Sequence, residues 1–152
     1  MTNKWFDYKM LKNVSGVQPD FQYGNGYESF IIRGFTTNSK FFRNGNRVFA
    51  ETVETANVEQ VDILKGPAAM LFGRIEPGGM VNIVTKKPQE KAYYSLQQQF
   101  GSYDFYRTMV DATGPLTENN SLLYRFNLAY LDSNSFRDVA FDERIFVSPS
   151  LT

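Results

Sequence analysis

The chain contains neither cysteine nor histidine among its 152 residues. Without cysteine, no disulfide pattern reports on the redox compartment of the protein. Without histidine, the commonest general base and the commonest nitrogen ligand for zinc are both missing. A serine or threonine nucleophile would have no imidazole partner, so we predict that the chain is not an enzyme and holds no metal site of its own.

Net charge and long apolar runs are absent as well. Lys and Arg together number 16, as do Asp and Glu, so no overall field attracts nucleic acid, and we predict no nucleic-acid partner. No stretch of about 18 apolar residues is present, so we expect no transmembrane helix. Residues 1–17 carry a charge every few positions and lack the apolar centre of a secretory signal peptide.

Aromatic residues, in contrast, are frequent, and so are segments of alternating polarity. Aromatics make up 16% of the chain, with nine Tyr and 14 Phe. That share is high for a soluble globular domain and suits a β-rich protein with belts of Tyr and Phe at a membrane interface.

The most strongly patterned stretch is Asn57–Pro88, NVEQVDILKGPAAMLFGRIEPGGMVNIVTKKP. Pro67 suits the first turn of a helix, because its missing N–H would have no partner there. Gly73 suits the position just after a helix end, where the backbone needs positive φ. The pattern predicts a strand, a turn, a short helix, a glycine turn and a second strand, over residues 61–64, 66–67, 68–72, 77–79 and 80–85.

This stretch resembles the plug domain of TonB-dependent outer-membrane receptors, in particular those for iron siderophores. The family pattern runs NVExVEVLKGPxxxLYGxxxPGGxVNxVTKxP, and Asn57–Pro88 matches it nearly letter for letter. Phe30–Phe35 (FIIRGF) and Arg43–Arg47 (RNGNR) match two further signatures. We expect a strand over Phe30–Gly34, with Arg33 inside its apolar run, and a turn at Asn44-Gly45. The resemblance implies a mainly β fold, in which a plug with a small mixed α+β sheet precedes the first strands of a transmembrane β-barrel.

Residues 89–152 alternate between apolar and polar side chains in segments of about ten residues, the length that a tilted strand needs to cross a bilayer. Alternation of apolar and polar residues, with tyrosines on the apolar side, is typical of membrane barrels. A soluble antiparallel sheet with one solvent-exposed face gives the same pattern. The plug-like stretch upstream favours the barrel. We predict antiparallel strands at about 92–101, 105–114 and 121–132, a loop at 133–142, and a fourth strand to the end of the chain.

We assign residues 1–90 to the plug domain and residues 91–152 to the start of the barrel. The family's TonB-binding box, the first part of the plug and most barrel strands have no counterpart here, so we expect a piece of a longer receptor. Two strand edges would be unpaired, and lipid cannot satisfy them. The unpaired edges predict that the isolated chain is insoluble or aggregates without partner segments, and the missing parts predict no transport by this polypeptide alone.

The resemblance also implies where a ligand would bind. Ferric siderophores are often anionic with flat catecholate or hydroxamate groups, which suit cationic and aromatic side chains. The candidate binding residues are Tyr23, Lys40, Phe41, Arg43, Arg47 and Phe49. Arg33 and Lys65 are expected to pair with carboxylates on the barrel wall. No cofactor is expected, and the ligand would be an iron–siderophore chelate.

The sequence thus predicts part of a receptor in the outer membrane of a Gram-negative bacterium. It would bind ferric siderophores and import them with energy delivered through TonB, so its partners would be the siderophore, TonB and outer-membrane lipid. The combination of IIRGF, LKGP and PGGMVNIVTKKP is similar to ferric hydroxamate and pyoverdine-type receptors. The alternatives are a soluble β-rich binding or adhesion module and a TonB-dependent receptor for cobalamin or a glycan.

Overall fold

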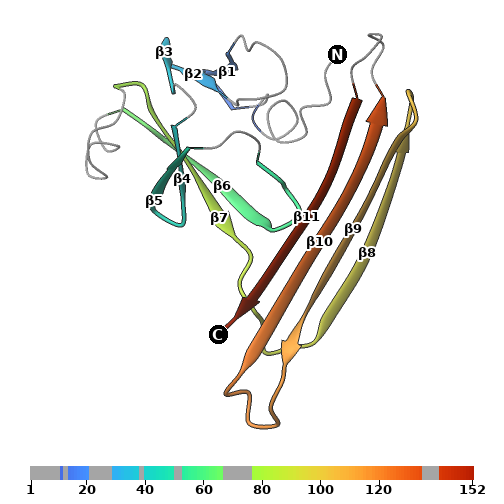
Figure 1. Cartoon of the computed structure of the whole chain (residues 1–152). Coiled ribbons are helices and arrows are strands. Elements are labelled where there is room, and N and C mark those ends of the chain that lie inside the picture. Colours follow the sequence, from blue (N-terminus) through green and yellow to red (C-terminus); the bar gives the residue numbers. More distant parts are fainter. Residues whose placement is uncertain are drawn as a thin grey trace. The chain divides into compact units, whose positions relative to one another are not determined.

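The computed structural model describes residues 11, 14–20, 29–37, 40–49, 53–66, 77–134 and 141–152. Strands dominate these residues, which confirms the mainly β fold class (Figure 1). The chain divides into two compact units, the N-terminal unit Thr2–Thr85 and the C-terminal unit Lys86–Thr152. The domain boundary predicted at residue 90 lies close to this division. Within the described part of the chain, no helix is both long and apolar enough to cross a membrane.

The N-terminal unit contains two sheets. The first is antiparallel and consists of β1 (Val17–Pro19), β2 (Phe30–Ile32) and β3 (Phe35–Thr36). The second has the order β5-β4-β7-β6 and consists of β4 (Lys40–Arg43), β5 (Asn46–Phe49), β6 (Val58–Lys65) and β7 (Gly79–Thr85). β4 runs parallel to β7, and the other pairs are antiparallel. The strands predicted at 61–64 and 80–85 are confirmed, and the helix predicted at 68–72 lies outside the described residues.

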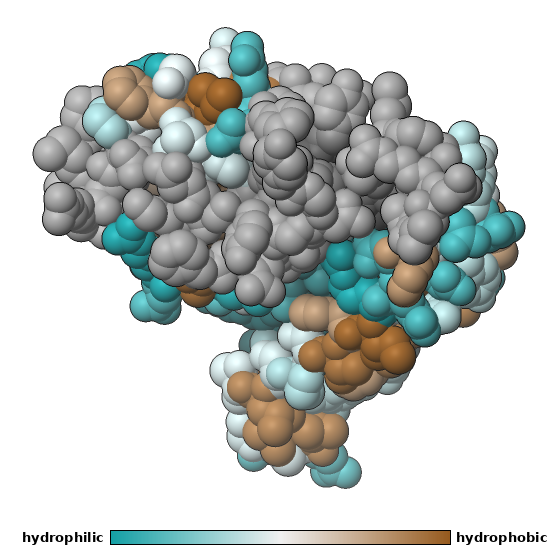
Figure 2. Space-filling model, turned by 45° about the horizontal axis from the view of Figure 1, so that its top comes forward, coloured by the Kyte–Doolittle hydropathy of each residue, from teal (hydrophilic) through white to brown (hydrophobic). Residues whose placement is uncertain are grey.

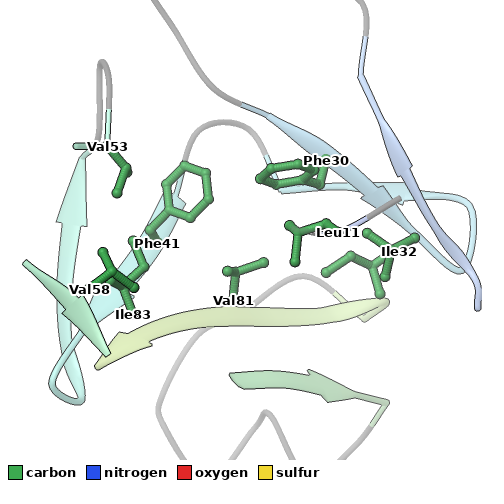
Figure 3. Close-up of a cluster of buried hydrophobic side chains, with 9 residues drawn as sticks. Leu11, Phe30, Ile32, Phe41, Val53, Val58, Val81 and Ile83 are labelled. Carbon is green, nitrogen blue, oxygen red and sulfur yellow. The ribbon is translucent and has the colours of Figure 1, made fainter. Parts of the chain in front are cut away.

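Both sheets of this unit contribute to one hydrophobic core, in which the labelled side chains of Figure 3 point toward one another. The rings of Phe30 and Phe41 meet edge to face, with centroids 5.8 Å apart. Val81 and Ile83, on alternate positions of β7, are fully buried beside them. Every second side chain of a strand points to the same face of its sheet, so alternate residues of β7 pack into this core.

The strand predicted over Phe30–Gly34 ends earlier, at Ile32. Arg33 and Gly34 have φ values of 51° and 84° and form the turn between β2 and β3. The Arg33 amide donates a hydrogen bond of 2.9 Å to the carbonyl oxygen of Gly16. The sequence placed Arg33 inside an apolar strand, where an unpaired charge would be costly. The turn removes that cost, because it leaves the Arg33 side chain exposed.

The turn that precedes β7 has no room for side chains at its two glycines. A Cβ added at Gly78 would lie 2.1 Å from the carbonyl oxygen of Ile32, and one added at Gly79 would lie 2.2 Å from that of Leu64. Gly79 also has a φ of 142°, which side chains disfavour. The paired glycines therefore let β2, β6 and β7 approach one another at one end of the unit.

The C-terminal unit is one antiparallel sheet with the order β11-β10-β9-β8 (Figure 1). Its strands are β8 (Tyr93–Gly101), β9 (Phe105–Pro115), β10 (Leu123–Asn134) and β11 (Phe141–Leu151). They are 9 to 12 residues long, which suits a bilayer crossing by tilted strands. The four predicted strands are confirmed. β10 continues to Asn134 and β11 starts at Phe141, so the loop predicted at 133–142 is shorter than expected.

The register of this sheet collects apolar side chains on one face, here called the apolar face. One row across the strands contains Leu96, Val110, Leu128 and Val147, and the next contains Tyr94, Ala112, Phe126 and Pro149. Leu96 and Ile145 on this face are 72% and 70% exposed. Figure 2 shows apolar surface gathered on the part of the molecule that carries these strands. The face therefore has no hydrophobic core over it in the described part of the chain.

We predict that Gly79→Ala lowers the free energy of unfolding of the N-terminal unit by about 3 kcal/mol, because the added Cβ combines a backbone clash with an unfavourable φ. Gly34→Ala is the matched control. Gly34 also has positive φ, but nothing lies within 4 Å of an added Cβ, so we expect a loss of about 1 kcal/mol. Urea unfolding in detergent micelles measures both. Equal losses in the two variants would contradict the close approach at Gly79.

Candidate functional site

Five of the six predicted binding residues lie on the β4–β5 hairpin of the N-terminal unit. Lys40, Phe41 and Arg43 are on β4, and Arg47 and Phe49 are on β5. Tyr23 lies outside the described residues. Asn44 and Gly45 connect the strands with φ values of 50° and 80°, as a two-residue hairpin turn requires. The Asn-Gly turn predicted from the sequence is thus present.

The hairpin separates Arg43, but not Arg47, from Lys40. Lys40 and Phe49 are Cα partners at the open end of the hairpin, whereas Arg47 pairs with Phe42 and Arg43 pairs with Asn46 beside the turn. Arg43 is three residues from Lys40 along β4, about 10 Å, and on the opposite face. Arg47 is the diagonal neighbour of Lys40 on the same face, about 7–8 Å away. By register, Lys40, Arg47 and Phe49 therefore share one face of the hairpin.

Phe41 lies in the core of the N-terminal unit and not on a binding surface. Its side chain is fully buried and contacts Phe30. Phe42, which points to the other face of β4, is buried too and packs with Met80 and Leu64. Two adjacent apolar residues in one strand are typical of strands that are covered on both faces. We therefore leave Phe41 out of the binding surface.

The Asn44-Gly45 turn is fastened to the end of β7. The Asn44 side chain donates to Thr85 Oγ1 at 2.8 Å and accepts from the Thr85 amide at 3.0 Å. The Gly45 amide donates to Asn82 Oδ1 at 3.0 Å. Since the N-terminal unit ends at Thr85, this turn lies at the exit end of the sheet, where the chain leaves the unit.

Cationic residues gather at the opposite end of the sheet. The Lys65 ammonium donates to the carbonyl oxygen of Ser15, and Arg33 Nη1 lies 3.0 Å from the position of an added Cβ on Gly66. Lys65 pairs with Gly79 in the ladder, and the β4–β7 register puts Lys40 level with the neighbouring Met80. This end, here called the cationic end, therefore carries Arg33, Lys40 and Lys65.

Neither Arg33 nor Lys65 has a carboxylate partner among the residues that the structure describes. Their predicted pairing with carboxylates of a barrel wall stays a prediction. Over the same described ranges, no three His, Cys, Asp or Glu side chains gather as a metal-binding group would. The chemistry available at the cationic end is attraction of an anion by fixed positive charge and hydrogen-bond donation.

The comparisons with known proteins agree with this architecture. The family model of the TonB-dependent receptor plug domain matches residues 8–80. The chain belongs to the TonB-dependent receptor family. Members of this family bind siderophores and interact with TonB. The family consists of receptors and transporters, which supports the prediction that the chain is not an enzyme.

Individual relatives have similar sequences and similar folds. The metal-pseudopaline receptor CntO of Pseudomonas aeruginosa is 49% identical over 109 residues, which are 72% of this chain and 15% of CntO. The pyoverdine outer-membrane receptor FpvA of P. aeruginosa, solved with bound pyoverdine, has a TM-score of 0.80 at 28% identity, over 90% of this chain and 21% of FpvA. The ferric-catecholate import receptor Fiu of Escherichia coli, in its closed form, has a TM-score of 0.82 at 28% identity, over 93% of this chain and 20% of Fiu.

These matches place the chain among plug domains followed by early barrel strands, as the sequence predicted. The N-terminal unit is hereafter called the plug unit, and the C-terminal unit the barrel-strand unit. The chain spans only about a fifth of the length of these relatives, or less. Activity, ligand and partners of the whole receptor are therefore matters for proposal.

We predict that Asn44→Ala lowers the free energy of unfolding of the plug unit by about 2 kcal/mol, because it removes both side-chain hydrogen bonds to Thr85. Asn46→Ala is the control, since Asn46 is exposed on the same hairpin, and we expect its effect to stay within about 0.5 kcal/mol. Urea unfolding followed by tyrosine fluorescence measures both. If Asn46→Ala and Asn44→Ala lowered the free energy of unfolding equally, the contact between Asn44 and Thr85 would not contribute specifically to stability.

Proposed function

We propose that this chain forms part of an outer-membrane receptor that binds a chelated metal ion and imports it with energy delivered through TonB. The bound complex is a ferric siderophore or a related anionic metal chelate. The observation that carries the proposal is the 49% identity with the CntO receptor over 72% of this chain. That span is too long to consist of the glycine turns alone.

The relatives favour a metal chelate over cobalamin or a glycan. CntO is named for metal-pseudopaline, FpvA for pyoverdine and Fiu for ferric catecholates. These ligands share a metal ion held by an organic chelator. CntO's name refers to a metal without specifying iron, so the metal carried by this chain's ligand is left open between iron and another transition metal.

We place the chelate at the cationic end of the plug unit. Arg33, Lys40 and Lys65 supply positive charge there, and Phe49 is the Cα partner of Lys40 in the hairpin. Arg43 lies about 10 Å from Lys40 along β4 and on the opposite face, whereas Arg47 is the diagonal neighbour of Lys40 on the same face. Of the residues proposed from the sequence, Lys40, Arg47 and Phe49 therefore remain the candidates on the described hairpin.

The barrel-strand unit supports a location in the outer membrane over a soluble binding module. A soluble sheet buries its apolar face against a second layer, but Leu96, Phe100, Ile145 and Leu151 are each at least 66% exposed. Tyrosines lie toward both ends of this face: Tyr94 and Tyr124 hydrogen-bond to each other at one end, and the rings of Tyr106 and Tyr130 meet edge to face at the other. Tyrosine at two levels is typical of the two interfaces of a bilayer.

A chimeric receptor tests the proposal. Residues 8–80 of this chain replace the corresponding plug segment of CntO, which supplies the remainder of a receptor. Binding of a metal–pseudopaline complex to the purified chimera is followed by quenching of tyrosine fluorescence. We expect Lys40→Ala to weaken binding about tenfold, because it removes a charge-assisted hydrogen-bond donor. Arg43→Ala removes the same charge from the opposite face of the hairpin, and we expect less than about a twofold effect.

The paired design separates two ways in which the proposal could be wrong. Loss of binding in Arg43→Ala with no loss in Lys40→Ala would move the ligand to the opposite face of the hairpin. Unchanged affinity in both variants would remove the hairpin from the site. A chimera that binds no metal–pseudopaline complex, although folded, would overturn the assignment of the ligand class.

A further inference from the structure

The segment that follows the plug unit lies against the polar face of β9 and β10. The Lys86 ammonium contacts Asp111 Oδ2 at 2.8 Å, and the carbonyl oxygen of Lys87 accepts from Arg125 Nη1 at 2.8 Å. Two residues later, the Gln89 amide donates to Thr113 Oγ1 at 2.9 Å. Three successive attachment points thus bind Lys86–Gln89, here called the exit segment, to the barrel-strand unit.

Asp111 and Arg125 are positioned for this contact by the register of β9 and β10. Arg125 is the Cα partner of Thr113, so Asp111 is its diagonal neighbour on the same face. Arg125 holds both carboxylate oxygens, with Nε 3.0 Å from Oδ1 and Nη2 2.8 Å from Oδ2. This two-point geometry fixes the plane of the guanidinium and aims its remaining edge at the Lys87 carbonyl.

The Asp111–Arg125 ion pair is largely buried, and the exit segment supplies partners for its remaining hydrogen-bonding groups. The side chains of Asp111 and Arg125 are 10% and 6% exposed. A buried ion pair is favourable only when the remaining donors and acceptors find partners. Lys86 and the Lys87 carbonyl are such partners, and Thr113, which is fully buried, both accepts from Gln89 and donates to the Tyr124 carbonyl at 2.8 Å.

We propose that Asp111 and Arg125, with Thr113, form a docking site that fixes the exit segment to the barrel-strand unit. The attached stretch ends at Gln89, and residues 90–92 beyond it are exposed. Any movement of the plug unit relative to these strands then pivots at the Thr85–Lys86 bond and not at the start of β8. Asp111 is a positioning residue in this arrangement, and it does not contact the ligand. The proposal goes beyond the proposed function, because it does not depend on which chelate is bound.

Limited proteolysis of the whole chain in detergent micelles tests the docking site. Trypsin cuts after Lys86 and after Lys91 but not after Lys87, because Pro88 follows. We expect Asp111→Asn to speed cleavage after Lys86 about tenfold, since a docked segment must detach before it can be cut. Cleavage after Lys91 should keep its rate. Asp142→Asn is the matched control, because Asp142 pairs with Arg144 on β11, away from the exit segment.

Each other outcome counts against the proposal. Equal cleavage after Lys86 in Asp111→Asn and Asp142→Asn would show that Asp111 does not hold the segment. Faster cleavage after both Lys86 and Lys91 in Asp111→Asn would assign the effect to opening of β8. If Asp111→Asn does not refold, Thr113→Val decides the matter: faster hydrogen exchange at the Gln89 amide supports docking, and unchanged exchange overturns it. Neither readout involves siderophore or TonB, so failure here is distinct from failure of the proposed function.

Discussion

The two-residue period of paired strands is the constraint on which the structure of this chain depends. In the barrel-strand unit, it places Leu96, Val110, Leu128 and Val147 in one row and leaves the neighbouring positions polar. A shift of the register by one residue would exchange the two faces. It would also separate Asp111 from Arg125, and with them the contacts of the exit segment. The apolar face and the polar attachment site are thus two results of one register.

The plug unit depends on a different feature, the close packing of backbone segments at two glycines. Gly78 and Gly79 let Ile32 and Leu64 come within a distance that no side chain permits. This approach brings Arg33 and Lys65 to the same end of the unit as Lys40. The opposite end is closed by the Asn44 contacts with Thr85. The proposed binding surface and the chain exit are therefore located at opposite ends of one small sheet.

Much of this arrangement could be predicted from the sequence, because its signals are local. Alternation in residues 124–130 and the β-branched run before Lys86 each encode a strand without reference to distant residues. The strand predicted through Arg33 was wrong, because Arg33 has a positive φ. A positive φ at a non-glycine residue has no sequence signal here beyond the adjacent Gly34. Phe41 was proposed for binding because it lies among cationic residues in the sequence, whereas the structure buries its side chain against Phe30.

The separation of Lys40 from Arg43 and the cluster around Asp111 were beyond sequence reasoning. Both follow from pairing registers between strands, which the local pattern does not determine. The parity of Asp111 and Arg125 placed them on the polar face, but only the register shows that Arg125 reaches Asp111 and the carbonyl of Lys87.

The central claim is that the apolar face of β8–β11 meets lipid, and the absence of cysteine from the chain allows a direct measurement. Single cysteines at residues 124–131 of β10 are labelled with an environment-sensitive fluorophore, and emission is recorded in lipid vesicles. We predict that emission at 124, 126, 128 and 130 is blue-shifted and quenched by a lipid-soluble quencher, and that emission at 125 and 127, which lie on the buried polar face, is not quenched by it. Quenching that does not alternate, or that alternates with the opposite parity, would contradict the account.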